Sequence, residues 1–176
     1  MILRPFSLTD APAVQRLAGD RDVASTTLNI PHPYEDGMAE EWINGQQQSF
    51  EQNEFVTFAV ALRPDNTLIG AISLHLDPGH DRAELGYWIG KPYWNQGYGT
   101  EAGRAVVQYG FEVIGLNRIH AAYLKRNPAS GRIMQKIGMM YEGCLQQHLK
   151  RWETFEDVEL YGILKRDYES QRDDGH

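Results

Sequence analysis

The sequence predicts a single α/β domain, and three observations support this prediction. The chain has 176 residues, a length that suits one domain and is short for two. Apolar runs typical of strands alternate with segments whose apolar residues recur at helical spacing. Three consecutive strand-like runs are joined by short, turn-rich pieces, and short connections of this kind make antiparallel neighbours.

Composition excludes several classes of protein. Hydrophobic residues make up 41% and charged residues 23%, which is ordinary globular usage. The net charge of -7 argues against a nucleic-acid surface and favours small or basic partners. The start lacks a basic segment followed by a long apolar core, and no stretch approaches the ~20 apolar residues of a membrane span. We therefore expect a cytoplasmic protein that contacts no membrane.

The number and spacing of the cysteines and histidines limit which disulfides and metal sites the chain can form. The single cysteine, Cys144, cannot form an internal disulfide, and the six histidines show no pair at a helical metal-binding spacing. We expect no metal site. Monomer and homodimer both remain open.

The first third of the chain predicts a strand and two helices. Residues 2–6 form a short apolar strand, after which Thr9 can cap a helix that carries Val14 and Leu17. Prolines at positions 31 and 33 exclude regular structure there. A second helix follows, with apolar residues at Met38, Ala39, Trp42, Ile43 and Phe50.

The rest of the chain predicts six further strands and two further helices. The strands are residues 55–62, 68–76, 82–89, 118–124, 139–145 and 158–164, the first three forming the antiparallel set. One helix follows Gly97 and ends at Gly115, with apolar residues at Ala102, Ala105, Val106, Tyr109 and Val113. Another begins at Asn127-Pro128 and ends before Gly138. Residues 170–176 are expected to fray.

Two glycines, one residue apart, stand at the entrance of the helix that follows Gly97. Glycine permits backbone conformations that other residues resist and lets a ligand approach the main chain. The first amide groups of a helix lack internal partners, and this end of the helix dipole is positive. Residues 96–100 therefore form an anion cradle that suits a phosphate.

Three interpretations of this glycine turn compete. The segment GYGTEA matches a dinucleotide-binding fingerprint, but residues 90–96 separate it from its strand, and the next strand ends in Lys125 and Arg126 with no acid to hold a ribose. Alternatively, the glycines only relieve crowding where strand meets helix. In the third interpretation the turn binds the pyrophosphate of coenzyme A. A nucleoside-triphosphate loop is excluded because Gly-Lys-Ser/Thr is missing.

The neighbouring motifs resemble those of the GNAT N-acetyltransferases. The run AELGYWIG followed by YWNQGYGTEA resembles their acetyl-CoA motif, and NPAS followed by KIGM resembles the motif that comes next. PHPY before the second helix, EGCL and the later DV are similar to the Rim-type branch, the ribosomal-protein-alanine N-acetyltransferases. The resemblance covers nearly the whole chain, residues 1–176, and implies a sheet splayed between strands four and five, with helices on both faces.

The resemblance implies a coenzyme site and an acceptor pocket. Acetyl-CoA is the expected cosubstrate, and its carbonyl is best polarised by a backbone amide near residues 87–89, where a bulge, which sequence alone does not reveal, would leave strand four unpaired. The expected coenzyme-binding residues are Tyr87, Trp88, Ile89, Gln96, Gly97, Tyr98, Gly99, Thr100 and Asn127. Tyr34 and Trp42 are candidates for the acceptor pocket, although buried aromatic residues are more often simply core.

Glu84 is the leading candidate for the general base. It lies on the same strand face as Gly86 and Trp88, and it resembles the strand-four glutamate of some GNAT enzymes. The alternatives are a carboxylate paired with Arg82 or facing solvent. His148 is the second candidate base, with a surface histidine as its alternative; some Rim-type enzymes use a late-strand glutamate where this chain has Leu149.

Ser130 is the candidate that would stabilise or protonate the departing thiolate. It resembles the serine proposed for this role in Rim-type enzymes, although a serine at a helix start commonly makes only local hydrogen bonds. Many GNAT enzymes use a tyrosine on this helix, where this chain has Met134. Many also begin the glycine motif with Arg or Gln, where this chain has Trp94.

These observations together predict an acetyl-CoA-dependent N-acetyltransferase that acts on a primary amine, either a peptide N-terminus or a small molecule. The transfer would be direct, in a ternary complex, because Cys144 has no paired histidine that would support an acyl-cysteine. The alternative is a GNAT-fold module that binds an acyl-CoA as a sensor or scaffold without turnover.

Overall fold

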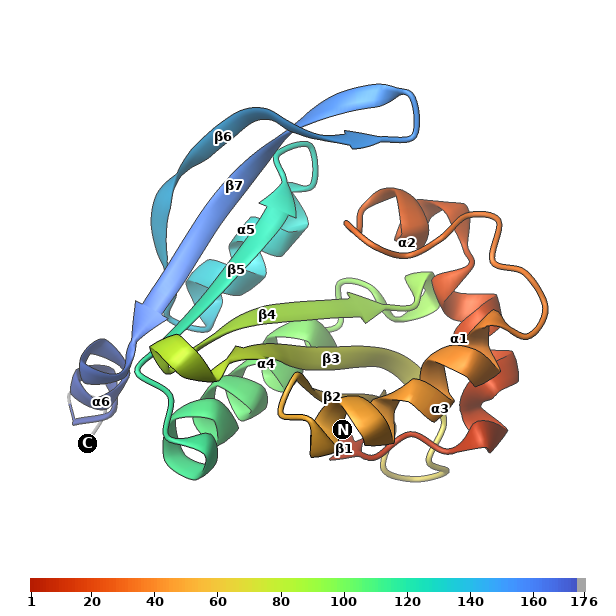
Figure 1. Ribbon diagram of the computed structural model, residues 1–176, viewed down its shortest axis with the longest axis horizontal. Coiled ribbons are helices and arrows are strands. Elements are labelled where there is room, and N and C mark those ends of the chain that lie inside the picture. Colours follow the sequence, from red (N-terminus) through yellow and green to blue (C-terminus); the bar gives the residue numbers. More distant parts are fainter. Residues whose placement is uncertain (174–176) are drawn as a thin grey trace.

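One seven-stranded sheet organises the chain, and the computed structural model describes residues 1–173 of it (Figure 1). The strand order is β1-β2-β3-β4-β5-β7-β6, and every neighbouring pair is antiparallel except β4 and β5. The strands are β1 (Ile2–Arg4), β2 (Phe55–Ala61), β3 (Leu68–Asp77), β4 (Arg82–Ile89), β5 (Arg118–Leu124), β6 (Met140–Arg151) and β7 (Thr154–Leu164).

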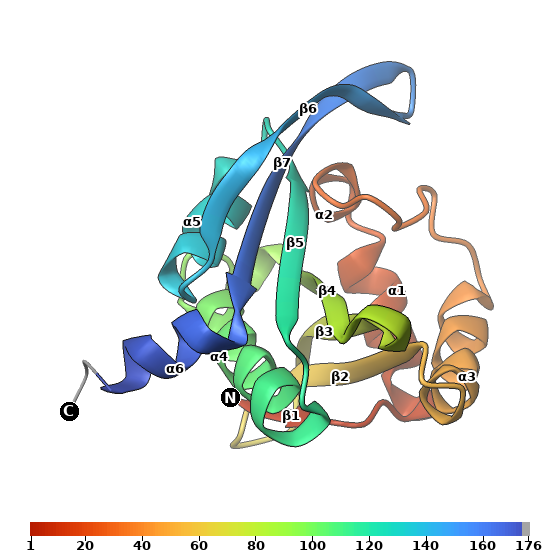
Figure 2. The ribbon, with the colours of Figure 1, turned by 60° about the vertical axis from the view of Figure 1, so that its left-hand side comes forward.

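Helices cover both faces of the sheet, as expected. The helices are α1 (Ala11–Ala18), α2 (Arg21–Ser25), α3 (Met38–Glu51), α4 (Tyr98–Tyr109), α5 (Pro128–Lys136) and α6 (Lys165–Asp173). α1 and α3 enclose a smaller apolar cluster with residues such as Val14, Ile43 and Ala59. α4 and α5 enclose the larger cluster, which includes Val106, Met134 and Ile119. In Figure 2 α3 and α4 lie on opposite sides of the strands β2 and β3.

The parallel pair β4 and β5 splits the sheet in two. The strands pair only over their first residues, where Arg82 lies opposite Arg118 and Glu84 opposite His120. Beyond this point they diverge, and the β6–β7 hairpin continues the departing half as a long arm whose end faces α2 (Figure 1). The splay between strands four and five is confirmed.

β4 contains no bulge against β3, a point that the sequence left open. All residues of β4 keep one register with β3, from Arg82 opposite Asp77 to Ile89 opposite Gly70. Backbone amides in the second half of β4 lack a strand partner for another reason, namely that β5 diverges from β4 there. Gly90 donates to the carbonyl of Ile69, and because hydrogen-bonding direction alternates along an antiparallel strand, the amides of Tyr87 and Ile89 point away from β3.

Several element boundaries differ from the sequence predictions. Thr9 does not cap α1: Ser7 caps a short 3-10 turn at residues 8–10, and Asp10 closes this capping box. β6 and β7 extend well beyond residues 139–145 and 158–164, and α2 and α6 were not predicted. Residues 170–173 belong to α6, and residues 174–176 of the predicted frayed tail lie outside the described residues.

Two residues that the apolar spacing predicted on buried helix faces are exposed in the structure. Phe50 and Val113 were predicted on apolar faces, but they are 51% and 68% exposed. Val113 lies in a turn of π-helix that follows α4, where the helical period changes. None of the helices within residues 1–173 is long and apolar enough to cross a membrane.

Candidate active site

A cleft of about 350 Å³ opens between the end of β4, the N-terminus of α4 and the start of α5. We call it the coenzyme cleft. Its lining includes most of the residues predicted to bind coenzyme, namely Tyr87, Trp88, Ile89, Gly97, Tyr98, Gly99, Thr100 and Asn127. Gln96 is absent from the lining, and its side chain donates instead to the carbonyl of Pro92.

The two glycines at the entrance of α4 are required for different structural reasons. Gly97 precedes α4 in the left-handed conformation, with φ of 85°, and a Cβ there would meet nothing within 4 Å. Gly99 is inside the helix, where a Cβ would lie 2.9 Å from the Cδ1 atom of Ile133. Gly97 therefore shapes the turn and leaves its outer side open, while Gly99 relieves crowding. The free amides that follow Gly97 suit a phosphate.

Two cationic side chains missed by sequence reasoning also border the coenzyme cleft. Arg132 and Lys136 lie one turn apart on α5 and line this cleft, and both are exposed. Their i, i+4 spacing places them on one side of the helix. Amides on α4 and cations on α5 thus flank the same space, a combination that fits the phosphates of coenzyme A.

Trp94 takes the place of the arginine or glutamine found in many GNAT motifs, and it has a structural role. Its indole Nε1 donates to the carbonyl oxygen of Ile89 at 2.7 Å. This bond ties the end of β4 to the turn before α4. The substitution therefore fixes the cleft wall, while the anion-binding amides of the turn are unaffected.

A second cleft, of about 430 Å³, lies on the other side of β4 and is here called the acceptor cleft. Apolar and aromatic residues from α1, α3, the loop after α2 and the sheet line it, Tyr34 and Trp42 among them. Glu84 is the one carboxylate among its described lining residues, and no Lys or Arg is among them. Trp42 packs edge to face on Phe6. Burial raises the pKa of the Tyr34 phenol, with Glu40 adding to the effect.

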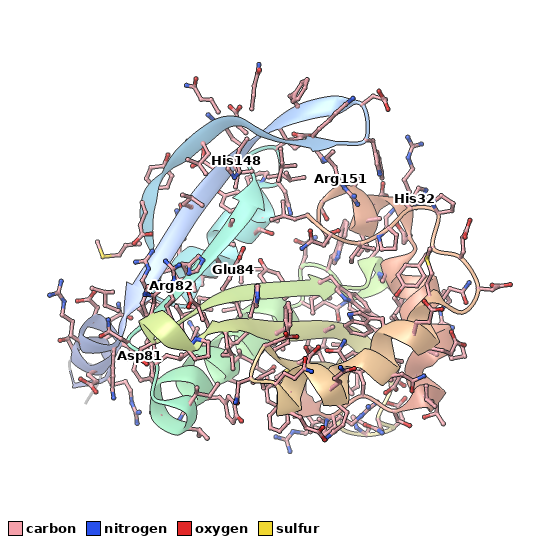
Figure 3. The ribbon with its side chains drawn as sticks, viewed as in Figure 1. His32, Asp81, Arg82, Glu84, His148 and Arg151 are labelled. Carbon is pink, nitrogen blue, oxygen red and sulfur yellow. The ribbon has the colours of Figure 1, made fainter. Side chains whose placement is uncertain are left out.

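Glu84 sits between two histidines in a row across the sheet. His75 of β3 is its antiparallel partner and His120 of β5 its parallel partner, so all three side chains share one face. The acid is half-buried and makes no ion pair within the described residues. Arg82, the alternative partner, pairs with Asp77 at 2.9 Å instead. Figure 3 shows Glu84 and Arg82 on β4, near the point where β5 departs.

His120 occupies the closed end of the split. Its Nδ1 atom is buried without a hydrogen-bond partner among the described residues. The pKa of His120 is lowered, chiefly by burial. Among the nearby charges, Arg118 and Arg82 also lower this pKa, whereas Glu84 and Glu142 raise it. Arg118 itself donates two hydrogen bonds to Glu142, one of them at 2.7 Å.

The two clefts meet at Ser130. Five residues line both: Thr26, Thr27, Tyr87, Trp88 and Ser130. The Ser130 hydroxyl accepts a hydrogen bond from the Asn127 side chain at 3.0 Å, so the local helix-start interaction anticipated from the sequence is present at the junction of the clefts. Glu84 lines only the acceptor cleft, on the same strand. An acyl group held at this junction would face an acceptor held beside Glu84.

His148 and Cys144 lie outside this junction. Both belong to β6, His148 is exposed, and neither lines either cleft. Figure 3 shows His148 high on the hairpin arm, away from Glu84. The structure therefore does not bring His148 together with the other candidate catalytic residues.

Two arginines tie the hairpin arm to the α2 region and were also missed by sequence reasoning. Arg151, at the end of β6, donates to the carbonyls of Ala24, at 2.6 Å, and Ile30. Arg126 donates to the carbonyl of Ser25 and pairs with Glu156 of β7 at 2.7 Å. Burial lowers the pKa of Arg151, and Arg126 adds to this effect. These contacts hold in place the loop that covers the acceptor cleft.

Comparison with known proteins agrees with this geometry. A family model described as an acetyltransferase (GNAT) domain matches residues 1–140. An uncharacterized N-acetyltransferase, YnaD from Bacillus subtilis, is 30% identical over 96% of this chain and 95% of its own. The putative ribosomal N-acetyltransferase YdaF of the same organism is 36% identical over 61% of this chain and 60% of its own.

The fold is shared with solved structures. A GNAT-family acetyltransferase from Bacillus anthracis superimposes with a TM-score of 0.82 at 30% identity, covering 93% of this chain and 94% of that one. The split between β4 and β5 and the amide turn before α4 fit acetyl-CoA, which supplies the acetyl group in this family. This chain belongs to the GNAT acetyltransferases, enzymes that transfer the acetyl group of acetyl-CoA to an acceptor amine.

Proposed function

We propose that the protein acetylates an acceptor that carries one primary amine, preferentially the α-amine of a peptide or protein N-terminus. The acetyl group is transferred directly in a ternary complex. The observation that carries this proposal is the meeting of the two clefts at Ser130, Tyr87 and Trp88. A donor and an acceptor can occupy separate clefts and touch only at this junction. Direct transfer needs no covalent enzyme intermediate, and Cys144 lines neither cleft.

Glu84 is the proposed base. An alkyl amine is mostly protonated near pH 7, so it must lose a proton before it can attack a carbonyl. The Glu84 carboxylate lines the acceptor cleft and has no ion-pair partner within the described residues, so it is free to accept a proton directly or through an ordered water. Ser130 and Asn127 are proposed to position the coenzyme at the junction.

The acceptor is proposed to carry one positive charge. A polyamine carries several charges, and burying each of them requires its own partner. The acceptor cleft offers one carboxylate, within mostly apolar and aromatic walls. An α-amine has a pKa near ~8, against ~10.4 for lysine, so it supplies more neutral nucleophile at pH 7. The similarity to YdaF, a putative ribosomal N-acetyltransferase, supports a protein acceptor.

The test is a set of matched acceptors, assayed by release of coenzyme thiol. One peptide has a free α-amine and no lysine, a second is the same peptide with its terminus blocked and one internal residue replaced by lysine, and spermidine represents the polyamines. We expect the free α-amine peptide to have the highest kcat/KM by at least about tenfold. Equal or higher kcat/KM with spermidine would contradict the single-amine proposal, and no thiol release with any amine would contradict N-acetyl transfer.

A further inference from the structure

The Tyr87 hydroxyl is buried at the junction of the two clefts and has no hydrogen-bond partner among the described residues. Leaving a buried hydroxyl unpaired costs about as much as a lost hydrogen bond, so such groups require an explanation. Ser130 lies close by, but the two hydroxyls do not form a hydrogen bond of normal geometry, and the Ser130 oxygen already accepts from Asn127.

The direction of Tyr87 follows from the strand. Leu85, Tyr87 and Ile89 alternate with Glu84, Gly86 and Trp88, so the Tyr87 side chain leaves β4 on the opposite face from the proposed base. Its ring packs against the larger apolar cluster beneath α4 and α5. The base and this phenol therefore lie on opposite faces of one strand. Its hydroxyl is oriented toward the coenzyme side and the start of α5.

The facing helix does not provide a phenol of its own. The position on α5 where many GNAT enzymes have a tyrosine is Met134, which is 2% exposed and lines the acceptor cleft. A thioether is only a weak hydrogen-bond acceptor and cannot donate. Among the residues common to both clefts, Tyr87 contributes the one phenolic donor, and it does so from the strand across the split.

We infer that the Tyr87 hydroxyl donates a hydrogen bond to the thioester sulfur and strengthens this bond as the sulfur leaves as a thiolate. The inference rests on the proposed acetyl transfer. The amine lone pair forms the new N–C bond, the C–S bonding pair departs on sulfur, and the amine proton passes to Glu84 or to water. Tyr87 keeps its own proton throughout and acts as a donor to developing negative charge.

The acidity of Tyr87 agrees with donation rather than proton transfer. Burial raises its pKa to about 12, and the Ser130 side chain acts in the opposite direction. An ordinary alkyl thiol has a pKa near ~8.5. A phenol so much less acidic than the thiol holds its proton at every working pH, so the thiolate leaves hydrogen-bonded and is protonated afterwards by solvent.

The test compares Tyr87→Phe with the parent by a measurement that needs no turnover. Ultraviolet absorbance of the thiolate gives the pKa of bound coenzyme A as pH is raised. A donated hydrogen bond stabilises the thiolate, so Tyr87→Phe should raise the pKa of the bound thiol by about one unit. With an acceptor, kcat should fall about tenfold while the KM for acetyl-CoA stays within about threefold.

Thermal unfolding of the free protein separates this role from a structural one. Because the hydroxyl has no partner, Tyr87→Phe should leave Tm unchanged or slightly higher. Tyr109→Phe, on α4 against Phe58 and outside both clefts, is the matched control and should leave the thiol pKa and kcat unchanged. A lower Tm in Tyr87→Phe with an unchanged thiol pKa would overturn the inference. The thiol measurement stands even if no amine acceptor is found, so failure of the proposed function would be seen separately.

Discussion

The coenzyme cleft and the acceptor cleft are built in different ways, although they share β4. The coenzyme cleft is lined by the turn and first residues of α4, from Gly97 to Thr100, and by the end of β4, where the amides of Tyr87 and Ile89 point away from β3. The acceptor cleft depends on side chains from α1, α3, the loop after α2 and four strands. Backbone amides, which nearly every residue carries, are the groups we expect to bind the phosphates, so we expect this side to tolerate changes such as Trp94. Acceptor selection depends on individual side chains.

The largest effect should follow from changing the acceptor side at Glu84. Glu84→Gln keeps the size of the side chain but removes the proton acceptor, so kcat should fall by about 10²-fold, most clearly at pH values below the pKa of the amine. The Kd for coenzyme A, measured by calorimetry, should stay within about twofold, since Glu84 lines only the acceptor cleft.

The control for Glu84→Gln is Glu153→Gln, which removes the same charge from a side chain that is 94% exposed at the hairpin turn. It should leave kcat unchanged. If the Glu84→Gln pH–rate profile overlays that of the parent, Glu84 is not the base, and solvent takes that role.

This contrast also explains which parts were predictable from sequence. The α4 entrance is local: Gly97, the helix start and the apolar spacing of α4 lie within one window, and all were identified. The histidines beside Glu84 come from β3 and β5, and only strand register brings them there. The sequence placed Glu84 on the strand face of Gly86 and Trp88 but did not indicate that His75 and His120 are its neighbours across the sheet.

The hairpin arm shows the same limit. The second half of β6, from Gln146 to Arg151, is mostly polar and exposed, so it carries no apolar alternation to mark a strand. Its pairing with β7 defines it instead. The carbonyl partners of Arg151 are more than one hundred residues away in the chain, and no sequence pattern predicts such a contact.

The second prediction tests the coenzyme side through charge alone. Gly97→Asp and Gly97→Asn introduce side chains of nearly equal shape at a left-handed position with open space around it. The aspartate places a negative charge beside the amides that should hold the pyrophosphate. Calorimetry should show coenzyme A binding at least about tenfold weaker in Gly97→Asp than in Gly97→Asn, or about 1.4 kcal/mol.

Because both variants carry the same backbone strain, differences in folding do not enter this comparison. Asp is at least as good a helix cap as Asn, so the Tm of Gly97→Asp should not be the lower of the two. Equal affinity in the two variants would show that the anion binds elsewhere.

The third prediction concerns the contact between the hairpin arm and the cover of the acceptor cleft. Arg151→Met removes the donor to the carbonyls of Ala24 and Ile30 while keeping an apolar stem. The acceptor KM should rise by about threefold to tenfold, and the free energy of unfolding should fall by about 1–2 kcal/mol. The Kd for coenzyme A should change less than the acceptor KM does.

Lys150→Met is the matched control, because Lys150 is adjacent in the chain and half-exposed, and its contacts are an ion pair with Glu153 at 3.5 Å and the ring of Phe155 at 5.9 Å. It removes the same charge and should leave the acceptor KM and the free energy of unfolding nearly unchanged. An equal rise in the acceptor KM in both variants would mean that charge, and not the hydrogen bonds of Arg151, matters to acceptor binding.

The smallest expected effect is on the pH dependence of stability, at the closed end of the split that both clefts share. Burial lowers the pKa of His120 in the folded protein, so the unfolded chain binds a proton there first as pH falls. The corresponding stability is present above the unfolded pKa near ~6.5 and is lost as pH falls through this value toward the lower folded one. In denaturant titrations between pH 7 and pH 5, His120→Asn should therefore lose less stability than the parent. Glu84→Gln removes a charge that raises the pKa of His120, so it should lose more stability than the parent over the same interval. Identical slopes in the parent and His120→Asn would show that His120 does not control acid stability, and an unchanged slope in Glu84→Gln would show that Glu84 and His120 are neighbours in register without electrostatic coupling.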